Sequence, residues 1–451
     1  MIHAITHVNL SRRALLGGAT LLGAASLLPL SSFAADDAGT LAEAAALWGY
    51  PLVETARYLK ISQDKGFGFN QFYLNAKLAT PSLKVAGPNI DTIYGFAWLD
   101  LAKEPIVLGV PDTADRYYSI QLIDAYENTF AYVGRRETGT KAGTFVIAPP
   151  GWTGQAPSGS KVIEAPTALV LAFTRTLVRS PEDAVAAAEL QKHYRLAPLS
   201  GWPAAAKDGI VQDDVLNILP VLDLSTSGAG FFDELNTLVK AYPPTGPEAA
   251  NFARVAGLGL DTDRFAANRP SDAVLADALK RAIGRIKAVS VAEVENGWRV
   301  NKHISRFIQD PAERAATNAY GPGAHIAEEA LYFSAVGDAG GQALSGANSY
   351  TLTFPAGQLP PVDAFWSLIL YGPDFFLVDN PLNRYGINDR TPGLKRNGDG
   401  SLTLTVSHTA PKDTANWLPA PEGRFQLLFR TYQPQAALLD GRYKLPPLQK
   451  A

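Results

Sequence analysis

Residues 87–151 constrain the fold of this chain most strongly, because short apolar runs alternate there with Pro, Asp, Gly and Asn residues. Runs of this length between residues that break regular structure are typical of consecutive β-strands. The segment therefore predicts a β-rich domain in the first half of the chain. The expected strands are 106–110, 117–123, 129–133, 144–148 and, just beyond the segment, 167–174.

A second group of β-strands is predicted near the end of the chain. An Asn-Gly-Asp-Gly sequence at 397–400 is a strong turn signal within this group. Well-separated strands without intervening helices favour an antiparallel sandwich or a jelly roll. The expected strands are 350–354, 364–371, 402–407 and 425–432.

Helical patterns lie before and between these two β regions. Residues 36–60 are rich in Ala and Leu with apolar residues at helical spacing, and Pro51 is expected to kink or divide that helix. Ser271 is expected to cap a helix over 271–288. The other expected helices are 181–195, 231–242 and 248–258.

The chain has 451 residues, which is too long for one typical hydrophobic core. We predict a mainly β protein with helical additions, of the α+β class, in which a helical segment separates two antiparallel β-sandwich or jelly-roll halves. The predicted divisions are 1–34 as a signal peptide, 36–60 as an N-terminal helix, 61–180 as the first β domain, 181–335 as the mainly helical segment and 336–451 as the second β domain.

The first 34 residues have the features of a cleavable twin-arginine export signal. Arg12 and Arg13 precede an apolar run at 14–30, and residues 32–34 offer small side chains for cleavage. The alternative is an N-terminal membrane anchor, but the apolar run is short for a span of ~20 residues. We expect export to the periplasm or outside the cell, with no stable membrane span after cleavage.

The composition argues against several kinds of chemistry. The chain contains no Cys and its one Met is Met1, so the exported protein would have neither a thiol nucleophile nor a sulfur ligand for a metal. A net charge of −3 provides no basic field to attract nucleic acid. The histidines after residue 34 do not have metal-motif spacing. We expect no cofactor, although the many oxygen ligands leave calcium or magnesium open.

Asn89, Asp91 and Tyr94 form the first candidate site. In an extended strand Asn89 and Asp91 share one face, while Tyr94 lies on the other. Asp91 could serve as a general base or as a ligand for a hard cation. The alternative is a turn in which its carboxylate accepts backbone N–H groups.

Arg116 and Tyr118 belong to a second cluster. The planar guanidinium of Arg116 suits a carboxylate, phosphate or sulfate. The alternative for Arg116 is a structural ion pair with an acid nearby in the sequence, namely Asp112, Asp115 or Asp124. The tyrosines of this region are expected in the core rather than as proton donors.

The C-terminal half contains a similar set of polar and aromatic residues. Trp366 and Tyr371 could line a pocket for a sugar or an aromatic ligand, with core packing as the alternative. Asp379, Asn380 and Arg384 repeat the Asp, Asn and Arg chemistry of the N-terminal half. If the two groups face one another across a domain interface, they form a pocket for an anion or a polyol.

Sequence motifs of the common enzyme classes are absent. There is no Gly-x-Ser-x-Gly elbow, no dinucleotide-binding glycine pattern and no P-loop. His325 follows the turn at 321–324 and could take part in catalysis. We favour a surface or capping role for it.

The chain resembles a known pair of families. Residues 87–95, 99–101, 107–112, 116–118 and 130–134 resemble the domain of unknown function numbered 1254. The C-terminal half resembles its usual companion, numbered 1214, at 365–367, 377–384, 397–402, 416–421 and Arg430. The resemblance implies two β-sandwich or jelly-roll halves with helical additions. It implies no catalytic residue and no activity.

The sequence is compatible with three functions. We favour an exported hydrolase or lyase that acts on a small polar or anionic molecule, with Asp91 as base, Tyr94 as proton donor or orienting group, and Arg116 or Arg384 as anion clamp. The alternatives are a ligand- or carbohydrate-binding protein without catalysis, and a jelly-roll assembly protein that forms a homo-oligomer. The predicted substrate-binding residues are Asn89, Tyr118, Trp366, Tyr371, Asp379, Asn380 and Arg384.

Overall fold

The computed structural model describes residues 35–451 except 86, 214, 221, 290, 291, 306 and 309. The predicted signal peptide at 1–34 lies outside the described residues. Within the described part of the chain, no helix is both long enough and apolar enough to span a bilayer.

The N-terminal half contains two β-sheets that pack face to face. Alternation along the strands directs Leu99, Ile120 and Val170 of the larger sheet toward Leu108 and Ile147 of the smaller one. The six-stranded sheet, in spatial order, consists of β10 (Ile210–Gln212), β1 (Tyr73–Asn75), β2 (Thr92–Asp100), β8 (Leu169–Leu177), β4 (Tyr118–Asp124) and β5 (Thr129–Gly134). The four-stranded sheet consists of β7 (Lys161–Glu164), β6 (Gly143–Ala148), β3 (Ile106–Val110) and β9 (Arg195–Pro198).

The C-terminal half repeats this two-sheet arrangement. Its core includes Phe354, Trp366, Leu404 and Phe429, which come from strands of both sheets. The six-stranded sheet consists of β11 (Glu293–Glu295), β12 (Trp298–Val300), β13 (Ala330–Ala335), β19 (Gln426–Pro434), β15 (Val362–Tyr371) and β16 (Gly386–Asn388). The four-stranded sheet consists of β18 (Trp417–Pro419), β17 (Leu402–Ser407), β14 (Tyr350–Phe354) and β20 (Gln449–Lys450).

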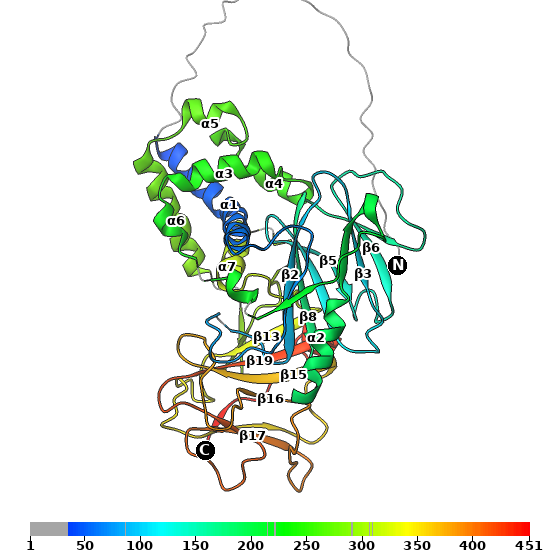
Figure 1. Ribbon diagram of the computed structural model, residues 1–451. Coiled ribbons are helices and arrows are strands. Elements are labelled where there is room, and N and C mark those ends of the chain that lie inside the picture. Colours follow the sequence, from blue (N-terminus) through cyan, green and yellow to red (C-terminus); the bar gives the residue numbers. More distant parts are fainter. Residues whose placement is uncertain are drawn as a thin grey trace, which may run out of the picture.

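A helical layer lies beside the N-terminal sheets (Figure 1). Trp48, Leu235 and Leu279 of this layer share a core with Phe96 and Phe173 of the six-stranded sheet. The α-helices are α1 (Ala35–Asp64), α2 (Ala184–Lys192), α3 (Gly230–Ala241), α4 (Gly246–Ala253), α5 (Asp263–Asn268), α6 (Asp272–Ala288), α7 (Pro311–Tyr320) and α8 (Ala436–Leu439). Short 3-10 helices are η1 (Pro181–Asp183), η2 (Leu199–Gly201), η3 (Val215–Ile218), η4 (Leu224–Ser227) and η5 (Ala256–Leu258).

The two six-stranded sheets face one another across the boundary between the halves (Figure 1). Tyr117 and Leu177 from the N-terminal half pack against Phe365 and Tyr432 from the C-terminal half. The Tyr117 ring lies 5.3 Å from that of Phe365 and 5.5 Å from that of Tyr432, both edge-to-face. The inner faces of these two sheets carry the polar groups described below.

The predicted α+β class is confirmed, with several antiparallel sheets that do not close into barrels among the described residues. The jelly-roll topology stays a prediction. Ser271 caps α6 as expected, since its hydroxyl accepts the N–H of Val274. Pro51 lies inside α1, which continues through it instead of being divided.

The sheets extend past the boundaries expected at residues 180 and 335. Strands β9 and β10 pair with β3 and β1 of the N-terminal half. Strands β11, β12 and β13 precede residue 336 but belong to the C-terminal six-stranded sheet. These strands are three to six residues long and lie among helices, so their alternation of apolar and polar residues is too brief to be recognised.

Candidate functional site

Arg175 and Arg430 each occupy the middle of a buried strand. Arg175 is the one charged residue of β8, and Arg430 is the one charged residue of β19. Both strands lie inside their sheets, between β2 and β4 and between β13 and β15. As a result the two arginines are only 3% and 4% exposed. Burial of a charge in this way requires compensation from partners.

The two sheets place their arginines in the same kind of environment. Arg175 is the cross-strand partner of Tyr94 on β2, and its guanidinium lies 5.3 Å from the Tyr94 ring centre. Arg430 is the cross-strand partner of Tyr332 on β13, and its guanidinium lies 5.9 Å from that ring. Each six-stranded sheet therefore contributes one arginine–tyrosine pair to the interface.

The described hydrogen bonds of both arginines go to neutral acceptors. Arg175 donates to Gln121 Oε1 at 2.8 Å and to the Gly323 carbonyl. Arg430 donates to the Tyr371 hydroxyl and to the Gly87 carbonyl, both at 2.7 Å. Neither forms an ion pair with a described residue. Because a guanidinium has five N–H donors, each arginine retains three for another partner.

Two further tyrosines lie near the arginines. The Tyr94 ring lies 5.3 Å from the Arg175 guanidinium, and Tyr432 lies two residues from Arg430 in β19, on the same face of the strand. The Tyr94 hydroxyl has no hydrogen-bond partner among the described residues, and the half-buried ring is the more accessible of the two. Tyr432 accepts a hydrogen bond from Asn89 Nδ2. Burial raises the pKa of Tyr432 well above its ordinary value, so its hydroxyl is neutral.

His325 is a buried member of the same interface. Its Nδ1 lies 3.2 Å from the Tyr132 hydroxyl, and its ring lies 6.2 Å from that of Tyr432. The Tyr132 hydroxyl also accepts the Ile326 N–H at 3.2 Å. Burial lowers the pKa of His325 well below its usual value, which keeps the imidazole neutral. The Nε2 atom has no partner among the described residues.

The placement of His325 differs from the surface or capping role expected from the sequence, because the side chain is fully buried. Its backbone N–H donates to the Tyr332 hydroxyl at 3.1 Å. The charged donors of the interface are the guanidinium groups of Arg175 and Arg430, which form no ion pair with a described residue. Positively charged N–H donors favour an anionic ligand.

Asn89 and Asp91 lie in the turn before β2, not in a strand with alternating faces, because β2 begins at Thr92. Asn89 Oδ1 accepts the N–H of Asp91 at 2.6 Å. The side-chain acceptor of this turn is therefore Asn89, whereas the alternative from the sequence was the Asp91 carboxylate. Asp91 Oδ1 accepts from Asn388 Nδ2 and Arg390 Nη2, both at 2.8 Å. Asp91 thus links the N-terminal half to the C-terminal half, while its buried Oδ2 has no described partner.

Replacement of Asp91 with asparagine is expected to lower the free energy of unfolding by about 1 to 2 kcal/mol, because the oxygen acceptor remains but the charge that pairs with Arg390 is lost. Urea denaturation measures the change. Asp413→Asn is the matched control, since Asp413 pairs with Lys395 at an exposed position, and it should change stability far less than Asp91→Asn does. Equal stability of Asp91→Asn and the wild type would contradict a linking role.

Tyr371 joins the site, but three other predicted residues lie elsewhere. Arg116 pairs with Asp183, an acid outside the three considered from the sequence, and donates to the Leu177 carbonyl at 2.7 Å. Tyr118 is on the opposite face of its sheet and donates to the Gly139 carbonyl at 3.2 Å. Trp366 stacks on Phe429 in the C-terminal core, with ring centres 5.4 Å apart.

Asp379, Asn380 and Arg384 form a surface loop that does not reach the arginine–tyrosine pairs. Asp379 is exposed, and Asn380 Oδ1 accepts the backbone N–H groups of Leu382 and Arg384 at 3.2 Å. The Arg384 guanidinium donates to the carbonyls of Thr414 and Trp417 at 2.8 and 2.9 Å. It therefore holds a neighbouring loop in place.

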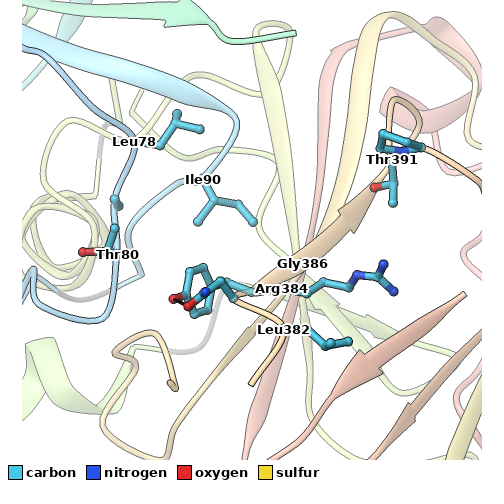
Figure 2. Close-up of a pocket in the computed structure, with 11 residues that line it drawn as sticks. Leu78, Thr80, Ile90, Leu382, Arg384, Gly386 and Thr391 are labelled. Atoms are coloured by element: carbon cyan, nitrogen blue, oxygen red, sulfur yellow. Dashed lines mark hydrogen bonds between the residues drawn. The ribbon is translucent and has the colours of Figure 1, made fainter. Parts of the chain in front are cut away.

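This loop borders a groove between the two halves with a volume of about 510 Å³. Figure 2 shows Leu78, Thr80 and Ile90 on one side and Arg384 directed away from Thr80. Ala79, Ile90 and Tyr385 line the groove and also pack against the cluster that contains Tyr371 and Tyr332. The groove thus lies next to the arginine–tyrosine interface.

No group of three or more His, Asp or Glu residues within the described ranges is arranged to hold a metal ion. The residues that the sequence analysis missed have different kinds of signal. A single arginine inside an apolar strand, at 169–177 and at 426–434, is an unusual pattern and could have identified Arg175 and Arg430. Tyr132 and Tyr332 resemble ordinary core tyrosines, and nothing in the sequence distinguishes them.

Comparison with known proteins gives two family matches. Residues 69–198 match the family described as "Protein of unknown function (DUF1254)". Residues 329–436 match the family described as "Protein of unknown function (DUF1214)". No curated protein matches the chain.

Comparison with solved structures gives one match with a shared overall fold. The VPA0106 protein from Vibrio parahaemolyticus is 24% identical, with a TM-score of 0.70, and the match covers 92% of this chain and 100% of that one. An uncharacterised protein from Burkholderia cenocepacia is 12% identical, with a TM-score of 0.44, over 92% of this chain and 95% of that one. The likeness to the Vibrio protein shows a shared overall fold.

Proposed function

This chain belongs to the DUF1254 and DUF1214 families through its two halves, and we propose that the halves together bind a small organic anion and act on it by acid–base chemistry. The observation that carries the proposal is the pair of buried arginines without a carboxylate partner among the described residues. A buried guanidinium is strongly favoured when an anion pairs with it. The ligand would supply the missing negative charge.

The proposed reaction is a hydrolysis or an elimination. Tyr94 supplies the proton, because its hydroxyl has no described partner and its ring lies beside Arg175. Asp91 is the proposed base, because its Oδ2 is buried without a described partner and its charge acts on Tyr371 and Tyr432. Export by the predicted signal peptide would place this activity in the periplasm or outside the cell.

The charge of Arg175 and Arg430 decides whether the site binds anions. Titration calorimetry of the full chain would use acetate, lactate, benzoate and glucuronate, with neutral sugars as controls. Arg175→Met and Arg430→Met are each expected to lower the affinity for the most tightly bound anion at least tenfold, since each removes one guanidinium group from a buried site. Arg175→Lys and Arg430→Lys keep the charge and should weaken binding less.

Arg116→Met is the matched control, because Arg116 is a buried arginine that already pairs with Asp183. It should lower stability but leave anion affinity unchanged. Anion affinity that is equal in the wild type and in both methionine variants of the site would overturn the proposal. Tyr94→Phe tests catalysis separately, since turnover should be lost while the dissociation constant stays within about threefold. An anion that binds without turnover in any variant would leave a binding protein in place of an enzyme.

A further inference from the structure

We infer that the ligand is a short dicarboxylate, with one carboxylate held by Arg175 and the other by Arg430. This inference rests on the proposed anion site and adds the chemical class of the ligand. Its basis is the number and position of the unpaired guanidinium groups, which are contributed by two different sheets.

Each arginine has a fixed plane and free donors. The Arg175 guanidinium lies 4.6 Å from the Phe173 ring, and the Arg430 guanidinium lies 5.8 Å from the Tyr371 ring. Contact with ring faces holds the guanidinium planes and leaves N–H edges for in-plane hydrogen bonds. One carboxylate fills one such edge through two parallel hydrogen bonds.

A single carboxylate would therefore leave the second arginine without a partner. The acids of the same interface are engaged elsewhere. Glu329 accepts from Arg136 at 2.6 Å and from the Tyr117 hydroxyl at 2.8 Å. Asp91 accepts from Arg390. Among the described residues, no carboxylate forms an ion pair with either Arg175 or Arg430, so a second charge on the ligand would pair with the second arginine.

The loop at 323–325 links the two guanidinium groups. Arg175 donates to the Gly323 carbonyl, and the N–H of His325 donates to the hydroxyl of Tyr332, whose ring centre lies 5.9 Å from the Arg430 guanidinium. The Tyr94 ring lies beside Arg175 and the Tyr332 ring beside Arg430, so their hydroxyl groups would be donors to the middle of a bound molecule. A short chain with an acidic group at each end matches this order of donors.

The test compares ligands that differ by one charge and hardly in shape. Titration calorimetry of the full chain at pH 7.5 would use malonate, succinate, glutarate and adipate, each with its monoamide. At least one dicarboxylate should bind ten times more tightly than its monoamide. In Arg175→Met and in Arg430→Met that preference should fall below threefold, while each variant keeps a cooperative melting transition. The lysine variants repeat the test if a methionine variant does not fold.

The outcomes separate this inference from the proposed function. Dicarboxylates and monoamides that bind equally well would overturn the dicarboxylate and leave the anion site, since one carboxylate would then bridge both arginines. Tight binding of inorganic phosphate or sulfate without binding of any dicarboxylate would also overturn it, in favour of a tetrahedral anion. Absence of binding by every anion tested would overturn the proposed function itself.

Discussion

Replacement of Glu248 with alanine is expected to lower the free energy of unfolding by about 3 to 5 kcal/mol. Glu248 pairs with Arg314, and the two side chains are only 3% and 2% exposed. Glu248 Oε2 also accepts the indole N–H of Trp48 at 2.9 Å. The substitution leaves a buried guanidinium without its partner and an indole N–H without its acceptor. Each of these raises the free energy of the folded state.

Urea denaturation would measure this loss, with Asp64→Ala as the matched control. Asp64 pairs with Lys60 at 2.8 Å, but the side chains are 62% and 73% exposed, so that variant should change stability by less than about 0.5 kcal/mol. The double variant Glu248→Met with Arg314→Met removes both charges and should recover most of the lost stability. A Glu248→Ala protein as stable as the control would show that the pair is dispensable.

Glu54→Gln is expected to change how stability depends on pH. Burial raises the pKa of Glu54 to about 8, with repulsion from Glu127 as a further cause, while Tyr58 and Arg57 oppose the shift. The folded pKa is therefore above the unfolded value near 4.5, so the folded state binds the extra proton. Stability from this group is fully present below pH 4.5 and decreases as the pH rises toward 8. Glutamine mimics the protonated acid at every pH.

Denaturation at a series of pH values between 4.5 and 8 would measure the effect. Within this window Glu54 should contribute a loss of about 1.4 kcal/mol per pH unit in the wild type, and the Glu54→Gln curve should be flatter by that amount. The variant and the wild type should have equal stability at the acidic end, and the variant should be more stable at pH 8. Glu189→Gln on the exposed part of α2 is the matched control. Parallel curves for Glu54→Gln and the wild type would contradict the assignment.

The β-strands could be predicted well from the sequence because their apolar runs are short, regular and separated by strong turn residues. The expected strands at 106–110, 350–354 and 402–407 coincide with β3, β14 and β17. Local patterns of this kind depend on neighbours in the sequence alone. The sheets themselves could not be predicted, since β10 pairs with β1 across more than a hundred residues.

The candidate site could be predicted only in part. Asn89, Asp91, Tyr94 and Tyr371 do lie at the interface, but their charged partners depend on contacts between the halves. The sequence cannot show that Arg116 is neutralised by an acid 67 residues away. Such long-range pairs decide which arginine is free for a ligand.

Tyr118 shows that a shift of one residue along a strand changes which face a side chain is predicted to occupy. Adjacent residues in a strand point to opposite faces, so Tyr117 lies in the interface between the halves while Tyr118 lies in the N-terminal core. The sequence gives no indication of which face of the strand meets the other half, because Tyr117 and Tyr118 are the same residue type and both are buried. The face that carries function is set by the partner sheet.

The two arginine–tyrosine pairs lie in different sheets, so each half of the protein contributes only part of the candidate site. Neither sheet alone contains a complete site, and a separated half would expose its guanidinium to water, where hydration replaces the ligand. Under the proposed function, a molecule bound between the halves would act as a noncovalent cross-link between them. Mechanical separation of the halves, or a protease cut in the connecting helices followed by dissociation, would release it. Under the proposed function, occupancy of the site would therefore depend on whether the two halves are docked.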